Sequence, residues 1–276
     1  MTPAERIPVA LSIAGSDSSG GAGIQADLKT FQAFGVFGTT AVTAVTAQNT
    51  RGVVGFAAID PDLVAAQIRA VCDDMPPAST KTGMLATAAV VRTVAMAVRD
   101  LELSSLVVDP VMVATSGDRL LEAAAIDAIR DMLLPLATLV TPNIPEAEVL
   151  LGRSIAGMDD MRAAAVELVR AGAAAALVKG GHLPGDEIVD LLWDGVEATV
   201  WRHRRLSTSS THGTGCTLSA AAVAGLARGR PLAGAVADAI DFTRRAIETA
   251  PRLGSGHGPV NHFIEPAIRR REPRCS

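Results

Sequence analysis

A glycine-rich run in front of an apolar helical pattern is the clearest sign of chemistry in this sequence. The run reads Thr211, His212, Gly213, Thr214, Gly215, Cys216, and the helical pattern follows over Leu218 to Arg228. Glycines at a helix start expose several backbone amides to one anion, and the helix dipole adds to the attraction. The run therefore predicts an anion site that can stabilise a phosphoryl group during its transfer.

Cys216 is the reactive side chain of this run. It would lie in the first turn of the helix, where the pKa of a thiol tends to fall, so we expect a functional rather than a structural cysteine. The other cysteines, Cys72 and Cys275, we interpret as a structural residue and a tail residue. His212 has a weaker case, because a histidine there can simply pack or cap.

A second glycine-rich segment, Gly15 to Gly23, joins the first apolar run to a helical pattern. Its glycines let the backbone approach a ligand closely, and the helix start offers unpaired amides. It lacks the lysine of a P-loop and the spacing of a dinucleotide fingerprint. From these residues alone, a ligand-binding loop and a plain strand-to-helix turn are equally good interpretations.

Polar residues also follow three later apolar runs. Asp109 can hold magnesium or cap a loop, and Asn143 with Glu146 can face one magnesium-water cluster, since magnesium keeps most of its waters. Ordinary helix capping is the better interpretation of Asn143 and Glu146 taken alone. Lys179 is one of three lysines in the chain, which favours a phosphate contact over a solvated position.

Short apolar runs alternate with longer helical patterns, which predicts a mostly parallel sheet covered by helices. The predicted strands are Val9–Ala14, Ser79–Gly83, Ser105–Asp109, Leu139–Thr141 and Ala175–Lys179, and the predicted helices are Ile24–Phe34, Pro61–Val71, Thr87–Arg99, Ala123–Leu134 and Asp159–Ala171. Ligands of such sheets collect at the carboxyl ends of the strands, where all the candidate residues above lie.

Two segment pairs break this alternation and predict antiparallel structure. Thr39–Ala47 with Val53–Ile59 is expected to form a small flap beside the main sheet, and Ile188–Trp193 with Ala198–His203 a second hairpin. No linker or repeat divides the chain. We therefore expect one domain over residues 1–276, with a core at about 9–262 and a basic tail at 266–276.

Composition limits the partners. The net charge of −4 gives no general attraction to nucleic acid or to anionic membranes. The short apolar run near the start is too brief for a signal peptide or a spanning helix, and three widely separated cysteines fit neither a disulfide framework nor a zinc site. We expect a cytoplasmic protein with no nucleic-acid or membrane partner.

Several motifs in this order resemble those of the hydroxymethylpyrimidine/phosphomethylpyrimidine kinases. They are Ala14–Asp17 through Gly23–Asp27, Ala47–Thr50, Gly83–Leu85, Asp109–Met112, Thr141–Glu146, Lys179–His182 and His212–Cys216. The resemblance runs from about Val9 to His262, and a set of motifs is far more specific than any single one. It implies a ribokinase-like three-layer α/β/α sandwich that transfers phosphate from ATP with Mg²⁺.

The resemblance also implies roles for individual residues. Gln48 and Met84 would contact the pyrimidine, with Asp17 and Gly15 close by, and Asp109 and Glu146 would serve Mg²⁺ through water. Asn143, Glu146, Lys179 and Thr211 would bind ATP and its phosphates. Gly213, Thr214 and Gly215 would form the anion hole, and Cys216 would accept the proton of the alcohol.

Two alternatives remain open from the sequence. A pyridoxal kinase of the same subfamily would carry a second cysteine after the Asp-Pro motif, where this chain has Met112, Val113 and Ala114. A regulator that binds nucleotide without catalysis would show damage in the phosphate machinery, which is intact here. Ser255 stands where many relatives carry lysine. The resemblance further leads us to expect a homodimer or a larger homo-oligomer.

Overall fold

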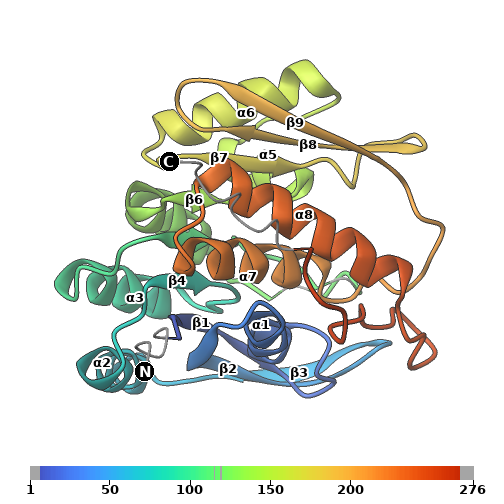
Figure 1. Ribbon diagram of the computed structural model, residues 1–276. Helices are drawn as coiled ribbons and strands as arrows, with labels where there is room; N and C mark the ends of the chain where they lie inside the picture. The colour runs from blue at the N-terminus through green and yellow to red at the C-terminus, as the bar shows by residue number, and fades with distance from the viewer. Residues whose placement is uncertain (1–6, 115, 119, 268–276) are drawn as a thin grey trace, which may run out of the picture.

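One mixed sheet of nine strands forms the centre of the computed structural model, which describes residues 7–114, 116–118 and 120–267 (Figure 1). In spatial order the strands are β3 (Gly52–Ala58), β2 (Phe37–Asn49), β1 (Val9–Asp17), β4 (Ser79–Thr82), β5 (Leu106–Val108), β6 (Leu139–Val140), β7 (Ala176–Lys179), β8 (Glu187–Trp193) and β9 (Ala198–Arg204). The six central strands pair in parallel, in the order β2, β1, β4, β5, β6 and β7. At one edge β3 pairs antiparallel with β2, and at the other edge β8 pairs antiparallel with both β7 and β9.

Helices cover both faces of the sheet, which confirms the expected three layers (Figure 1). One face carries α1 (Gly23–Ala33), α7 (Thr214–Ala227) and α8 (Leu232–Glu248), and the other carries α2 (Pro61–Asp74), α3 (Ala88–Asp100), α4 (Ala123–Ala128), α5 (Ile144–Leu151) and α6 (Met158–Arg170). Each face buries its own apolar cluster against the sheet. Such two-sided burial is what keeps a parallel sheet stable.

Local chemistry explains where helix α2 begins. Asp60 caps α2 by accepting a hydrogen bond from the amide of Asp62, and Pro61 occupies the first helical position. Strand β4 has an unusual composition for its position, because all of its residues (Ser, Thr, Lys, Thr) are polar yet buried in the middle of the sheet. Central parallel strands are normally apolar, so β4 is shaped by the site rather than by the core.

Both expected antiparallel pairs are confirmed, since 39–47 pairs with 53–59 and 188–193 pairs with 198–203. The segment 39–47 also pairs in parallel with β1, so the flap is continuous with the main sheet. Other elements differ from the prediction. The expected helix 123–134 is α-helical only as far as Ala128. A π turn and then a 3₁₀ turn follow, and Pro135 lies in the 3₁₀ turn. Helix α7 begins at Thr214, ahead of Leu218. Helix α8 was not predicted.

Within residues 7–114, 116–118 and 120–267, no helix is both long and apolar enough to cross a membrane. Most of the basic C-terminal tail, including Arg269 to Arg274, lies outside the described residues, as does Cys275.

Candidate active site

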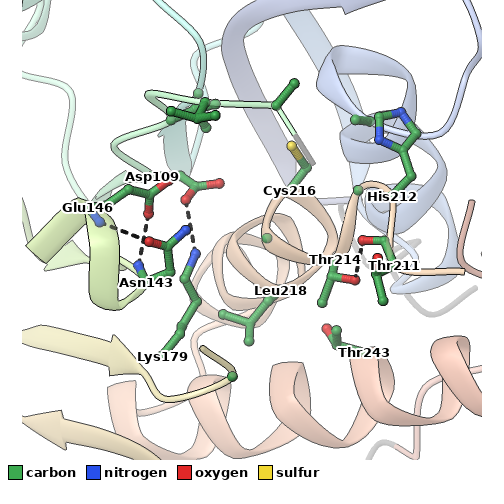
Figure 2. Close-up of a pocket in the computed structure, with 18 of the residues that line it drawn as sticks. Asp109, Asn143, Glu146, Lys179, Thr211, His212, Thr214, Cys216, Leu218 and Thr243 are labelled. Atoms are coloured by element: carbon green, nitrogen blue, oxygen red, sulfur yellow. Dashed lines mark hydrogen bonds and ion pairs between the residues drawn. The ribbon is translucent and has the colours of Figure 1, made fainter. Parts of the chain in front are cut away.

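A cavity of about 660 Å³ opens at the carboxyl ends of the parallel strands, against the start of α7 (Figure 2). The structure brings all the candidate residues from the sequence to its wall: Gly15, Asp17, Gln48, Met84, Asp109, Asn143, Glu146, Lys179, Thr211, Gly213, Thr214, Gly215 and Cys216. These residues come from the ends of β1, β2, β4, β5, β6 and β7 and from the first turn of α7. The topology therefore gathers side chains that are far apart in the sequence.

The start of α7 leaves backbone amides free to face the cavity. Gly213 precedes the helix in the left-handed region (φ 80°), and no side chain caps the helix. Within the described residues, the amides of Gly213, Gly215 and Cys216 have no hydrogen-bond acceptor. Thr211 contributes its carbonyl oxygen, which accepts a hydrogen bond from the hydroxyl of Thr214 at 2.7 Å (Figure 2). This arrangement is a ready anion site.

Two glycine loops interlock beside this site. A Cβ on Gly213 would lie 1.8 Å from the carbonyl oxygen of Gly21, and a Cβ on Gly21 would lie 2.5 Å from the ring of His212. The imidazole of His212 in turn hydrogen-bonds the carboxylate of Asp17 at 2.8 Å. The loop after β1 and the loop before α7 thus hold each other in place, and His212 has a positioning role.

Asp17 is an anchor for its own loop. Its carboxylate accepts hydrogen bonds from the amides of Ser19, Gly21 and Ala22, in addition to the contacts with His212 and the hydroxyl of Ser19. Burial alone would raise the pKa of Asp17, but these hydrogen bonds outweigh it and lower the pKa to about 2. With its oxygens engaged in this way, Asp17 shapes the wall of the cavity more than it offers a free contact to a substrate.

We expect Asp17→Asn to destabilise the protein most at neutral pH. The pKa of Asp17 is about 2 in the folded state against an ordinary value of 3.8, so ionised Asp17 stabilises the fold above pH 3.8 by about 2 kcal/mol, and this is lost as the pH falls through 2. Urea unfolding from pH 7 down to pH 2.5, about the practical limit, should show the gap to wild type closing towards acid. A gap independent of pH would contradict the role of the ionised carboxylate.

A buried cluster of charges lies on the opposite side of α7 from His212 (Figure 2). The ammonium of Lys179 lies 3.3 Å from the Asp109 carboxylate, which also accepts a hydrogen bond from the hydroxyl of Ser219 at 2.9 Å. Burial favours the protonated form of Asp109, but Lys179 and Lys81 hold the pKa of Asp109 below its usual value. The cluster therefore keeps a carboxylate and an ammonium, both charged, at the cavity wall.

Asn143 and Glu146 form a capping box at the start of α5. The side chain of Asn143 accepts from the amide of Glu146 at 2.9 Å, and the Glu146 carboxylate accepts from the amide of Asn143 at 2.8 Å. The capping that the residues alone suggested is therefore present. Burial, together with the charge of Asp109, raises the pKa of Glu146 to about 7, although Lys179 opposes the shift.

The environment of Cys216 contradicts one expectation from the sequence. Burial raises the pKa of its thiol to about 11, whereas a first-turn position alone suggested a lowered pKa. Lys81 and the amide of Gly23 act in the opposite direction but do not overcome the loss of solvent. At neutral pH the thiol of the ligand-free site is therefore almost entirely neutral.

Gln48 and Met84 line the end of the cavity beside β1 and β2. The amide group of Gln48 makes only long contacts, 3.4 Å to His212 and 3.3 Å from the hydroxyl of Thr46, so it is available to a ligand. The sulfur of Met84 would lie 3.0 Å from a Cβ on Gly15. A side chain on residue 15 would therefore push against Met84 and narrow this end.

The opposite end of the cavity was missed by sequence reasoning. Its lining includes Leu218 of α7, Thr243 and Arg244 of α8, and His203 of β9. The hydroxyl of Thr243 and the Nδ1 atom of His203 are buried without a hydrogen-bond partner in the described part of the chain. Unpaired buried groups of this kind suit a polar ligand. The helical spacing of apolar residues in α8 could have identified the helix that carries Thr243 and Arg244.

Two loops contact the β2–β3 turn and the start of β3. The carbonyl of Thr50 accepts a hydrogen bond from the amide of His257, and the guanidinium of Arg51 donates to the hydroxyl of Ser255 at 2.8 Å. The carboxylate of Asp118 accepts from the amide of Val53 at 3.0 Å. Ser255, the departure from the family pattern, thus serves as a contact of the turn.

Comparison with known proteins agrees with this geometry. A family model described as phosphomethylpyrimidine kinase matches residues 17–261. The hydroxymethylpyrimidine/phosphomethylpyrimidine kinase of Rhizobium meliloti is 51% identical over 258 residues, which cover 92% of this chain and 97% of that protein. A thiamine biosynthesis bifunctional protein of Geobacter sulfurreducens is 48% identical over 254 residues, covering 92% of this chain and 52% of that protein.

Among solved structures, an ADP complex of Bacillus subtilis pyridoxal kinase superposes with a TM-score of 0.87 at 39% identity, covering 93% of this chain and 98% of that one. This likeness confirms the ribokinase-like fold that the resemblance implied. The match over nearly the whole chain confirms the expected family as well. The chain belongs to the hydroxymethylpyrimidine/phosphomethylpyrimidine kinase family.

Proposed function

We propose that this protein transfers the terminal phosphate of ATP to 4-amino-5-hydroxymethyl-2-methylpyrimidine and then to the resulting monophosphate, for thiamine diphosphate synthesis. The observation that carries the proposal is the order of groups along one cavity. The end of the cavity with Gln48, proposed for the pyrimidine, is on one side of Cys216 and the free amides of α7, and the Lys179 cluster is on the other. A phosphoryl group between them would meet both the amides and a cation.

In this proposal the two transfers use the site unequally. The first acceptor is an alcohol, whose proton would pass to the sulfur of Cys216 as a thiolate. The second acceptor is a phosphate oxygen that is already anionic and needs little deprotonation. Because the pKa of the thiol is raised to about 11, the first transfer depends on the groups that lower it.

Magnesium is proposed from the chemistry of the donors. Asp109 and Glu146 present oxygen atoms on the same side of the cavity, and their charges influence each other. The described residues contain no cluster of three or more His, Cys, Asp or Glu side chains suited to a metal. Two carboxylates fit magnesium held partly through water on ATP phosphates. When bound, the ion would neutralise charge on those phosphates.

Pyridoxal is the competing substrate, because the similar Bacillus subtilis structure is a pyridoxal kinase. The loop after Asp109 favours the pyrimidine, since Met112 and Val113 stand where a second cysteine was expected for a pyridoxal kinase. ADP release with each acceptor, with the mass of each product, tests the proposal. Two successive gains of phosphate on the pyrimidine are expected, and turnover with pyridoxal alone would overturn it.

Gln48→Ala should weaken pyrimidine binding far more than ATP binding. It removes a polar partner of the ring edge and leaves the phosphate site untouched, so we expect a loss of about 5- to 150-fold in pyrimidine affinity, equivalent to about 1–3 kcal/mol. Calorimetry with each ligand separately measures this. Gln32→Ala, at an exposed position of α1, is the control. Equal weakening of both ligands would remove Gln48 from the substrate site.

A further inference from the structure

A lysine at the cavity wall and an aspartate behind it form an ion pair without any exposed side-chain surface. The ammonium of Lys81 in β4 lies 2.7 Å from the carboxylate of Asp27 in α1, and both side chains have 0% exposure. The second oxygen of Asp27 accepts a hydrogen bond from the hydroxyl of Ser12 at 2.6 Å. Burying two charges is costly, and neutral side chains of similar shape often serve stability equally well. Stability alone is therefore a weak explanation of this pair.

The pair lies next to the transfer site. The ammonium of Lys81 would be 3.6 Å from a Cβ on Gly83, and both residues belong to the cavity wall together with Cys216. Asp27 lies one helical turn beyond Gly23, whose amide donates to the sulfur of Cys216. Helix α7 also packs on β4. Strand β4 and helix α1 thus hold a buried dipole close to the sulfur.

The charges around the sulfur do not act equally. Lys81 has the largest electrostatic effect on Cys216 and lowers the pKa of its thiol, whereas Asp27 and Asp109 raise it. Lys179 also interacts electrostatically with Cys216, since a charge on Cys216 would raise the pKa of Lys179. Within the described residues, the single hydrogen bond of Lys81 goes to Asp27, although an ammonium has three donors. Asp27 is therefore the one direct partner of the Lys81 ammonium in the described part of the chain.

We propose that Lys81 is a positioning residue of the transfer site, whose buried ammonium, oriented by Asp27, supplies the positive charge that stabilises negative charge on the sulfur of Cys216. The proposal deepens the proposed function and rests on it for its catalytic meaning. Lys81 is not a catalytic residue, because its side chain has no surface for a reactant to touch. It acts through Cys216.

Alkylation of Cys216 by iodoacetamide tests this without any turnover. The thiolate forms a sulfur–carbon bond and releases iodide, so the rate between about pH 7.5 and 9.5 reports how easily the sulfur becomes charged. Mass spectrometry of the peptides separates Cys216 from the other cysteines. The variants are Lys81→Met, Asp27→Asn and the double variant, and Cys72 in α2 is the internal control for loosening of the fold.

The expected results have opposite signs. Removing a neighbouring positive charge raises the pKa of a thiol by about one unit or more, which lowers the fraction of thiolate about tenfold. A thiolate of higher pKa is also a stronger nucleophile, so the labelling rate falls by only about threefold. Lys81→Met should label Cys216 at least about threefold more slowly. Asp27→Asn should label it faster, because the charge of Asp109 still favours the protonated form of Lys81. The double variant should match Lys81→Met, since an unpaired buried Asp27 would take up a proton.

Loosening of the fold would instead accelerate labelling in every variant and at Cys72 as well. Unchanged rates, or changes of one sign in both single variants, would overturn the proposal. If the single variants fail to fold, the double variant decides alone, because it replaces the pair by neutral side chains of similar size: slower labelling supports the proposal and a wild-type rate overturns it.

A kinetic arm separates this proposal from the proposed function. Lys81→Met should lower kcat for the alcohol with little change in KM, and it should cost little more in a protein that already carries Cys216→Ala. If the labelling rates change as expected but kcat does not, the field of Lys81 is real and the base role of Cys216 is wrong. If neither changes, Lys81 has no part in the site.

Discussion

Cys216→Ala is expected to slow transfer to the alcohol by roughly a hundredfold to ten-thousandfold, which is the range for a lost general base. Transfer to the monophosphate should suffer less, because its nucleophile is already charged and the amides of Gly213 and Gly215 still face the phosphoryl group. Single-turnover rates with the two substrates on the same variant measure the difference. Equal slowing of both steps would make Cys216 part of the anion site or of the local fold.

Two further measurements would distinguish proton transfer by Cys216 from a packing role. Cys216→Ser keeps the size of the side chain but not its acidity, so it should behave like alanine if proton transfer matters and like wild type if only packing matters. The pKa of the thiol is about 11, so the thiolate fraction grows with pH, and the alcohol transfer of the wild type should accelerate from neutral towards alkaline pH. The alanine variant should lack this rise.

Lys179→Met is expected to slow both transfers, by roughly a hundredfold to a thousandfold, as for the loss of one donor to a developing charge. The substitution removes the cation between the cavity and the carboxylate of Asp109, which lies 3.3 Å from it. ATP affinity should fall as well. In the proposed function the cation would serve the phosphoryl group and not the acceptor, so the ratio of the two transfer rates should stay close to that of the wild type.

The control for Lys179 is Arg202→Met. Arg202 pairs with Glu187 at 2.7 Å on β8 and β9, and both side chains are about half exposed, so this pair contributes little to stability and lies outside the cavity wall. Its rates should equal those of the wild type. A Lys179→Met variant that slows one transfer alone would point to a role beside the acceptor instead of the nucleotide.

The sequence predicted most strands and the position of the cavity, because apolar runs and glycine-rich helix starts are recognisable from neighbouring residues alone. Short apolar runs identified β1 and β5 to β7, and the residues that follow them line the cavity. The uncapped helix start at α7 could be predicted, because a glycine-rich helix start needs no tertiary information. The individual roles of the lining residues remain predictions.

What the sequence could not supply depends on neighbours distant in the chain. The raised pKa of Cys216 follows from burial, which its position in a helix turn does not reveal. The role of Asp17 as an anchor depends on His212, which is distant in the sequence. The sequence revealed the antiparallel pairing of β2 with the neighbouring β3, but not its parallel pairing with β1. The buried pair of Lys81 and Asp27 gave no local signal either, since its members lie 54 positions apart.

The interlock of the two glycine loops has a consequence for synthesis of the chain. The contact of Asp17 with His212 joins positions 195 residues apart, so the first loop leaves the ribosome long before its partner exists. Contacts of such separation form late in folding, after the closure of a very long loop. A nascent or truncated chain that ends before α7 would therefore display the loop after β1 with no helix start opposite it. The two loops can close the cavity only after His212 and the start of α7 have been synthesised.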